Sequence, residues 1–168
     1  CFSSISRKKT LILLNINFNH KKERNFFNRL KKISSKKLDH HIHNLHNEVF
    51  DKTSCIECAN CCKTTSPIFN NNDIQRIAKN LKIKFSDFID KYLTIDSDND
   101  MVLKSSPCVF LSNENKCEIY DFRPKACKEY PHTDRKKQSQ ILDLSRKNTL
   151  VCPAVAEIFE KIKIRLNY

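Results

Sequence analysis

Residues 54–63 read SCIECANCCK, which places four cysteines within eight positions and makes the last two neighbours. Two-residue gaps let one turn of backbone present both sulfurs to a single centre, while amides of the turn donate hydrogen bonds to the thiolates. Side chains of consecutive residues diverge, so Cys61 and Cys62 are expected to face different partners. The stretch therefore predicts a metal site built on cysteine thiolates.

Four further cysteines follow at wider spacing, and disulfides compete with metal as the explanation for all eight. Disulfide-rich domains are usually short and secreted, whereas the best candidate for a signal-peptide core, LILLNINF at 11–18, is short and interrupted by two asparagines. We therefore predict a cytoplasmic protein that keeps its thiols reduced for metal binding. The predicted ligands are Cys55, Cys58, Cys61, Cys62, Cys108, Cys117, Cys127 and Cys152.

The spacing of these ligands bears on the kind of metal. Tetrahedral sulfur sites suit zinc and iron–sulfur clusters alike. The run C-x2-C-x2-C matches the first three ligands of the bacterial ferredoxin pattern, whose remaining cysteine precedes a proline, as Cys152 does here. We favour a [4Fe-4S] cluster, with Zn2+ as the alternative. Eight thiols suffice for two four-ligand sites, but we favour one cluster with spare or second-site thiols, since a spare cysteine packs as a small apolar residue.

Glycine is absent from all 168 residues, which excludes several kinds of site. Phosphate-binding loops, dinucleotide-binding folds and nucleophile elbows need glycine for positive φ or close backbone approach. Positions with positive φ are expected to fall to asparagines such as Asn60, Asn71 and Asn113. No window approaches eighteen consecutive apolar residues, so no membrane-spanning segment is expected.

The formal charge of +12 is concentrated near the start of the chain. Residues 1–40 hold 11 Lys/Arg against two acidic residues, and the remainder carries a net charge of only +3. A basic arm of this kind could contact nucleic acid or an anionic membrane, and the alternative is a solvated, partly disordered extension. The positive charge is thus predicted to belong to the arm rather than to the cysteine-rich part.

Apolar periodicity predicts a mainly helical chain. The segment LDHHIHNLHNEVFDK at 38–52 carries an apolar stripe at three- to four-residue spacing. The stripe consists of Leu38, Ile42, Leu45, Val49 and Phe50. His40, His41, His43 and His46 fall beside it, which leaves open a metal site on this helix.

Further helices are expected on both sides of a hairpin. One begins at Asn71 or Asn72, a second begins near Ser86, and a third has Pro153 in its first turn. Apolar and polar residues alternate over 94–111 around an Asp/Asn turn, which predicts two short strands. We predict a mainly α fold with a small β-hairpin, in a compact domain organised by metal. The predicted segments are a basic, disordered extension at 1–24, a helical segment at 25–52 and a metal-cluster domain at 53–168.

Three motifs carry a family resemblance. CIECANCC at 55–62, PCVFL at 107–111 and CEIYDFRPKACKEYPH at 117–132 together resemble the CxxCxxCC (YkgJ-like) cysteine-cluster family of bacterial proteins. That family is described as a zinc- or iron-chelating domain and is often labelled an iron–sulfur protein. The resemblance implies ligands drawn from the eight cysteines between Cys55 and Cys152. Some relatives are linked to flagellin lysine methylation, but no S-adenosylmethionine site is recognisable here.

Basic residues near the cysteines are candidates for the surroundings of a cluster. A thiolate-bound cluster carries negative charge, which Arg123 and Lys125 are placed in sequence to offset. The alternative for Arg123 is an ion pair with Asp121 that shapes the loop. His132 is a candidate imidazole ligand, with a role beside the cluster or on the surface as the alternative.

Three functions remain in view. The first is an iron–sulfur protein that transfers electrons or handles iron for a partner protein. The second is a zinc-stabilised interaction module that contacts RNA through the basic arm. The third is a cluster-dependent enzyme related to flagellin lysine methylation. In each case the cysteine domain is expected to fold with its metal, because the ligands lie on loops spread over almost a hundred residues.

Overall fold

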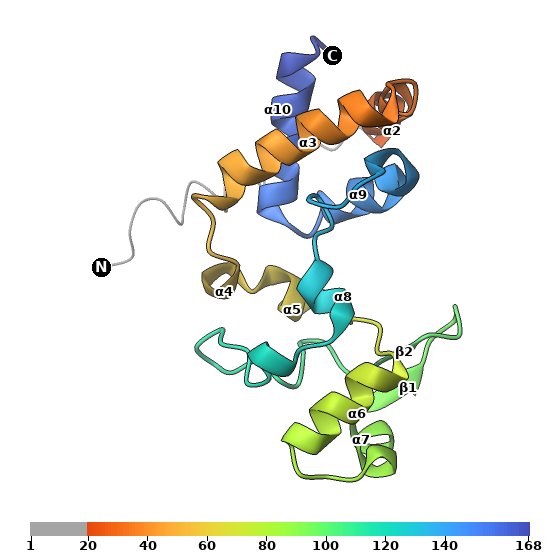
Figure 1. The fold of residues 1–168 in the computed structure, drawn as a ribbon, viewed down its shortest axis with the longest axis vertical. Coiled ribbons are helices and arrows are strands. Elements are labelled where there is room, and N and C mark those ends of the chain that lie inside the picture. Colours follow the sequence, from red (N-terminus) through yellow and green to blue (C-terminus); the bar gives the residue numbers. More distant parts are fainter. Residues whose placement is uncertain (1–19) are drawn as a thin grey trace. The chain divides into compact units, whose positions relative to one another are not determined.

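The structure is a computed structural model and describes residues 20–168. It is mainly helical with one two-stranded antiparallel hairpin, which confirms the predicted fold class. Two structural units divide the chain, and Figure 1 labels most of their helices and strands. Unit 1 joins the described residues up to Thr53 with Pro131–Tyr168, and unit 2 is Ser54–Tyr130.

Unit 1 is a group of helices around its own apolar core. Its elements are α2 (His20–Leu30), α3 (Ser35–Phe50), the 3-10 helix η2 (Gln138–Ile141), α9 (Leu142–Asn148) and α10 (Pro153–Arg165). The predicted stripe of α3 is confirmed, because Leu38, Ile42 and Leu45 are fully buried. They pack in one cluster with Ile158 and Ile162 of α10. Burial of these periodic side chains stabilises both helices, since isolated helices of this length are marginal in water.

Unit 2 combines a small α/β core with cysteine-bearing loops. Its elements are α4 (Cys55–Cys58), α5 (Asn60–Thr64), α6 (Asn71–Asn80), α7 (Phe85–Tyr92), β1 (Leu93–Ile95), β2 (Met101–Leu103), the 3-10 helix η1 (Tyr120–Phe122) and α8 (Lys125–Glu129). The predicted hairpin is confirmed, with Leu93 opposite Leu103. Its turn is closed by Asp96, whose carboxylate accepts the amides of Asp98 and Asp100 at 3.0 and 2.9 Å.

Helix starts differ from the predicted caps by one or two residues. The N-cap of α6 is Asn70, whose side chain accepts the amide of Asp73 at 2.9 Å, rather than Asn71 or Asn72. The N-cap of α7 is Lys84, which makes no side-chain cap. Ser86, the predicted cap, lies inside the helix and donates to the neighbouring Asp87 carboxylate.

Positive φ occurs at other residues than the three asparagines named from the sequence. Ala59 has φ 47° and Asn115 has φ 62°, whereas Asn60 and Asn71 are helical. Asn113 is not among the described residues with positive φ. The general expectation that asparagine takes such positions is met at Asn115, but Ala59 adopts φ 47° without being glycine or asparagine.

The structural units divide the chain differently from the predicted segments. Helix α2 begins at His20, before the predicted boundary at residue 24, and residues 1–19 lie outside the described part. Residues 131–168 join the N-terminal helices instead of the cysteine-bearing loops, because the apolar face of α10 shares the core of α3. The charge follows the units: Ser54–Tyr130 contains 11 basic and 11 acidic residues and is neutral.

Candidate metal centre

The cysteine run of unit 2 is folded as two single-turn helices that meet at Ala59. The Ser54 hydroxyl caps α4 by accepting the Glu57 amide at 3.3 Å. Ala59 ends α4 in the left-handed conformation and also serves as the N-cap of α5. This reversal separates Cys55 and Cys58 on α4 from the adjacent pair Cys61 and Cys62 on α5.

A backbone hydrogen bond connects the Cys108 loop to α5. The amide of Cys108 donates to the carbonyl of Cys62 at 2.8 Å. Two residues away, the Ser106 hydroxyl donates to the carbonyl of Lys63 at 3.0 Å. Cys108 is thereby held beside Cys62, although 46 residues separate them in sequence.

Cys117 is placed beside Cys108 by a small antiparallel turn. An isolated β-bridge pairs Leu111 with Cys117, and the Glu118 amide donates to the carbonyl of Phe110 at 2.9 Å. The amide of Phe110 donates to the Cys108 sulfur, and the amide of Ile119 donates to the Cys117 sulfur. Amides that donate to a thiolate stabilise its negative charge, as a metal ligand requires.

The fourth cysteine of this group, Cys127, lies on α8. Its amide donates to the carbonyl of Pro124, the N-cap residue of that helix, at 3.0 Å. Cys62, Cys108, Cys117 and Cys127 come from four segments, and every pair among them interacts electrostatically. We call these four residues the thiol tetrad.

The four thiols of the tetrad have unequal pKa values. The hydrogen bond from the Cys61 thiol, together with the charge of Lys63, lowers the pKa of Cys62 to about 7. Burial and the neighbouring thiolates raise the pKa of Cys127 to about 12. Burial also raises the pKa of Cys108 and Cys117. Cys62 is therefore the thiol of the tetrad that most readily becomes a thiolate at neutral pH.

The first two cysteines of the run lie apart from this arrangement. Cys55 and Cys58 are exposed, whereas Cys61 and the tetrad are half-buried. Burial raises the pKa of Cys55, with smaller contributions from Cys58 and Cys62. Cys62 thus interacts both with the tetrad and with Cys55.

The donor set fits a thiophilic metal. The tetrad is made of four sulfurs, and such sets suit zinc and iron–sulfur clusters. Within residues 20–168, no three Cys, His, Asp or Glu side chains are already arranged around one ion position.

Two predicted or candidate ligands belong to unit 1. Cys152 is the N-cap residue of α10 and packs against the core of that unit. His132 lies on the loop before η2 with φ 67°. Among the helix histidines, His43 Nε2 bonds to the Arg135 carbonyl and His46 Nδ1 to Thr133 Oγ1, each at 2.7 Å.

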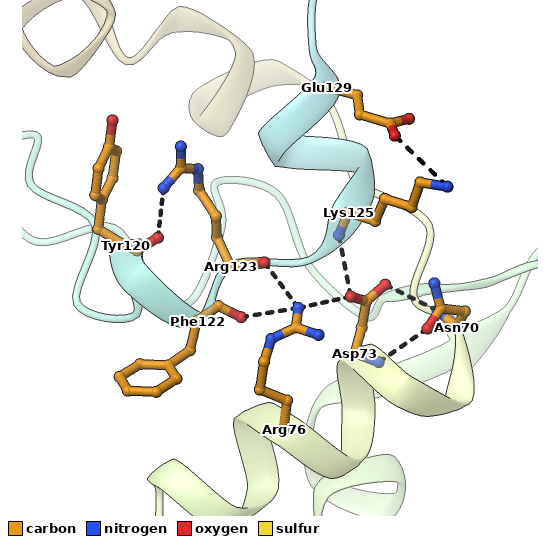
Figure 2. A network of polar contacts seen from close by, with 8 residues as sticks. All are labelled: Asn70, Asp73, Arg76, Tyr120, Phe122, Arg123, Lys125 and Glu129. Carbon is orange, nitrogen blue, oxygen red and sulfur yellow. Dashed lines mark hydrogen bonds and ion pairs between the residues drawn. The ribbon is translucent and has the colours of Figure 1, made fainter.

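The two basic residues predicted to offset cluster charge differ in their surroundings. Arg123 lies over the Tyr120 ring at 3.9 Å and donates to the Tyr120 carbonyl at 2.6 Å (Figure 2). Its charge acts on Cys117 and Cys127 by lowering their pKa against the larger effect of burial. The ammonium of Lys125 instead lies 3.5 Å from the Glu129 carboxylate. No ion pair between Arg123 and Asp121 occurs among the ion pairs found in the described residues.

Asp73 and Arg76 were not identified from the sequence as residues near the site. Asp73 is buried and accepts hydrogen bonds from Arg76 and from the Lys125 amide (Figure 2). The sequence does contain Asn70-x-x-Asp73, the motif of a capping box, which indicates where α6 starts. The motif does not indicate that Asp73 would contact Lys125, some fifty positions away.

The chain is similar to a known protein sequence but to no solved structure. None of the described helices is both long and apolar enough to cross a membrane. The chain is 30% identical over 90 residues to an uncharacterized protein, MJ0661, of Methanocaldococcus jannaschii, covering 52% of this chain and 48% of that protein. The chain thus spans about half the length of this relative. No solved structure matches the chain.

The family match covers the segments that carry the cysteines. The model of a family described as "Putative zinc- or iron-chelating domain" matches residues 54–152, which include all eight predicted ligands and more than half of the chain. The chain therefore belongs to the CxxCxxCC family of zinc- or iron-chelating domains.

Proposed function

We propose that the thiol tetrad binds one metal centre, that this centre is a [4Fe-4S] cluster, and that the protein transfers electrons or handles iron for a partner protein. The observation that supports the proposal most directly is that backbone contacts bring cysteines of separate segments of unit 2 near one another, such as the bond from the Cys108 amide to the Cys62 carbonyl at 2.8 Å and the bridge between Leu111 and Cys117. Membership of a zinc- or iron-chelating family supports metal binding in general. A bound cluster would supply one-electron chemistry.

The preference for iron–sulfur over zinc rests on the sequence, because an all-sulfur donor set with amide donors suits both. The donor set consists of sulfur alone, and backbone amides donate to two of the four sulfurs. Hydrogen bonds to the sulfurs are among the features that set the potential of such clusters. The ferredoxin-like spacing belongs to Cys55, Cys58 and Cys61, which lie outside the tetrad, so it favours iron–sulfur chemistry for the protein rather than for the tetrad itself.

The remaining predicted ligands are Cys55, Cys58, Cys61 and Cys152. The reversal at Ala59 lets Cys61 and Cys62 serve different centres, so Cys55, Cys58 and Cys61 are proposed to supply ligands for a second centre or for exchange with the first. Cys152 remains the proposed eighth ligand. Cysteine-to-serine replacement at 55, 58, 61 and 152 in turn, with metal content per chain as the readout, would assign each of them.

Purification without oxygen, followed by measurement of iron, zinc, acid-labile sulfide and the visible spectrum, tests the proposal. About four irons with as many sulfides per chain, and colour that bleaches on reduction, are the expected result. About eight irons would indicate two clusters. Zinc without colour or sulfide would contradict the iron–sulfur assignment and retain metal binding.

A zinc-stabilised module that binds RNA is the second candidate, and the charge of unit 1 favours it. The first turn of α3 carries Lys36 and Lys37, and the Asp39 carboxylate accepts the amides of Lys137 and Gln138 at 2.8 Å each. These bonds place exposed lysines of α3 beside the exposed basic loop 135–137. Phosphate contacts by such residues make binding strongly dependent on salt.

RNA binding is better tested by reversing the charge of single lysines than by deleting the basic residues 1–40. Removal of residues 1–40 would also delete Phe27, Leu30 and Leu38, which are buried in the core of unit 1. Replacement of Lys36 and Lys137 by glutamate is expected to weaken RNA binding and flatten its salt dependence. Unchanged binding would exclude this surface.

A further inference from the structure

Helix α6 is joined to the segment between Cys117 and Cys127 by a network of polar contacts (Figure 2). The network is centred on Asp73 and Arg76. Asp73 and Arg76 are three residues apart on one face of α6, and Arg76 Nη2 lies 2.6 Å from Asp73 Oδ1. The pair points toward the residues that precede and begin α8.

Asp73 acts as a cap for a helix to which it does not belong. The N-cap residue of α8 is Pro124, which provides no side-chain cap, so the first amides of α8 need acceptors from elsewhere. Asp73 Oδ1 accepts the amide of Lys125, the first residue of α8, at 3.1 Å. Cys127 lies two residues further along the same short helix.

Arg76 holds the residues on the other side of Pro124. Its Nη2 donates to the carbonyl of Arg123 at 3.0 Å and to that of Phe122 at 3.3 Å. A planar guanidinium can serve a carboxylate and carbonyls together, which the single ammonium of lysine does less well. The segment Phe122–Lys125 is therefore fixed on both sides of its proline by one side-chain pair.

Burial makes this arrangement costly to disturb. The Asp73 side chain is 3% exposed, and a buried carboxylate is tolerated only when it is paired and hydrogen-bonded. Helix α8 fully buries none of its own residues, whereas Pro124 just before it is buried. The hydrogen bonds of Asp73 and Arg76 join the residues on both sides of this proline to α6.

We propose that Asp73 and Arg76 are positioning residues for the metal centre, which hold Cys127 within reach of Cys62, Cys108 and Cys117. The inference rests on the proposed function, because it assigns the pair a role in building the tetrad. Replacement of either residue should weaken metal binding by Cys127 more than metal binding by the other three cysteines.

The test uses the full-length reduced protein with Zn2+ as the probe. Zinc affinity is measured by competition with a chelator, and protection of each cysteine from iodoacetamide is mapped by mass spectrometry. The variants are Arg76→Gln, Arg76→Lys and Asp73→Asn. Lys79→Gln and Asp87→Asn, both at exposed positions on α6 and α7, are the matched controls.

In the Asp73 and Arg76 variants we expect zinc affinity to fall by about 10- to 100-fold, the usual effect of removing residues that orient ligands. Cys127 should become reactive in the zinc-loaded protein, while Cys62, Cys108 and Cys117 stay protected. Arg76→Lys should retain more affinity than Arg76→Gln. Circular dichroism of the zinc-free proteins shows which variants remain folded.

Two results would overturn the inference. One is unchanged affinity and unchanged protection of Cys127 in a folded variant. The other is an equal loss of protection at all four cysteines, which would assign the pair to the fold of unit 2 alone. If the wild-type protein binds no zinc, protects no cysteine and also lacks iron when purified without oxygen, the proposed metal site fails instead, so the two failures are distinguishable.

Discussion

Ala59 occupies a backbone conformation that usually requires glycine, and it does so between the two halves of the cysteine run. Its φ of 47° lets the chain reverse between α4 and α5 within one residue. Its methyl group is buried, with 4% of the residue exposed. The smallest side chain with a Cβ thus combines the turn with some apolar packing.

Ala59→Val is predicted to lower the free energy of unfolding of unit 2 by about 2–3 kcal/mol, because a β-branched residue is strained at positive φ and overfills the site. Ala59→Gly is the control. It should stay within about 1 kcal/mol of the wild type, since relief of strain offsets the loss of one buried methyl. Urea denaturation followed by circular dichroism measures both. A valine variant as stable as the wild type would contradict the role of this turn.

His46 makes the stability of unit 1 dependent on pH. It stacks on Phe50 at 4.5 Å between ring centroids, and burial lowers its pKa although Asp134 opposes the shift. Because the unfolded chain then binds protons more readily than the folded one, stability is fully present above the ordinary pKa of 6.5 and falls as the pH drops below it. The pKa of His41 is lowered in the same direction, again chiefly by burial.

Unit 1 is therefore predicted to unfold at lower urea concentration at pH 5 than at pH 7. His46→Asn should reduce this difference, because asparagine does not titrate and can retain a hydrogen bond to Thr133. Unfolding midpoints at several pH values measure the effect. An unchanged pH dependence in the variant would show that His46 is not its source.

Residue chemistry was the part of the site most accessible from sequence. Cysteines at two-residue gaps indicate metal binding because few other roles need that spacing. The grouping of the cysteines was not accessible, because it depends on contacts such as the bond from the Cys108 amide to the Cys62 carbonyl. The position of Asp73 beside Lys125 depends on the same kind of long-range packing.

At the scale of elements, two isoleucines of α10 allow the contribution of its apolar face to the stability of unit 1 to be measured. Ile158 is fully buried in the core, whereas Ile164 on the same helix is 75% exposed. Ile158→Ala is predicted to cost about 2–5 kcal/mol, and Ile164→Ala under about 0.5 kcal/mol. Thermal unfolding of the two variants provides the comparison. Equal effects would contradict the packing of α10 described above.

Periodicity predicted elements better than it predicted their ends. The apolar stripe of α3 and the start of α10 at Pro153 follow from spacing and from proline geometry. The start of α6 did not, because four candidate residues, Asn70 to Asn72 and Asp73, can all cap a helix. Only the reciprocal bonds between Asn70 and Asp73 select among them.

At the scale of the whole molecule, apolar packing stabilises one set of segments, and the proposed metal would stabilise another. Helices α4, α5 and α8 bury no apolar residue among them beyond the intervening Ala59, and each has five residues or fewer. Helices α3, α6 and α10 contribute fully buried side chains to two apolar clusters. Removal of metal should therefore loosen the cysteine-bearing segments first.

Hydrogen exchange with and without chelator tests this expectation. Residues 54–65 and 120–130 should exchange faster in the metal-free protein, because isolated helices of one turn are unstable. Amides of α3, α6 and α10 should keep their protection. Equal loss of protection over the whole chain would contradict this division of roles.

The division into units could not be predicted from composition. Pro131–Tyr168 follows the cysteine motifs directly, without a glycine- or serine-rich linker to mark a boundary. This segment belongs to unit 1 because α10 packs against the core that contains α3. The apolar pattern of α10 alone does not show which helix it would contact. The neutrality of unit 2 could be read from sequence only once its limits were known.

The most direct test of a metal centre on the thiol tetrad is the metal content of oxygen-free wild-type protein beside that of Cys62→Ser. Cys62 has a pKa lowered to about 7, so its sulfur is the one of the tetrad that most readily becomes a thiolate ligand at neutral pH. We predict stoichiometric metal in the wild type and its loss in Cys62→Ser, while the fold of unit 1 is retained. A wild-type protein without iron or zinc, or a Cys62→Ser variant that keeps its full metal content, would contradict the account.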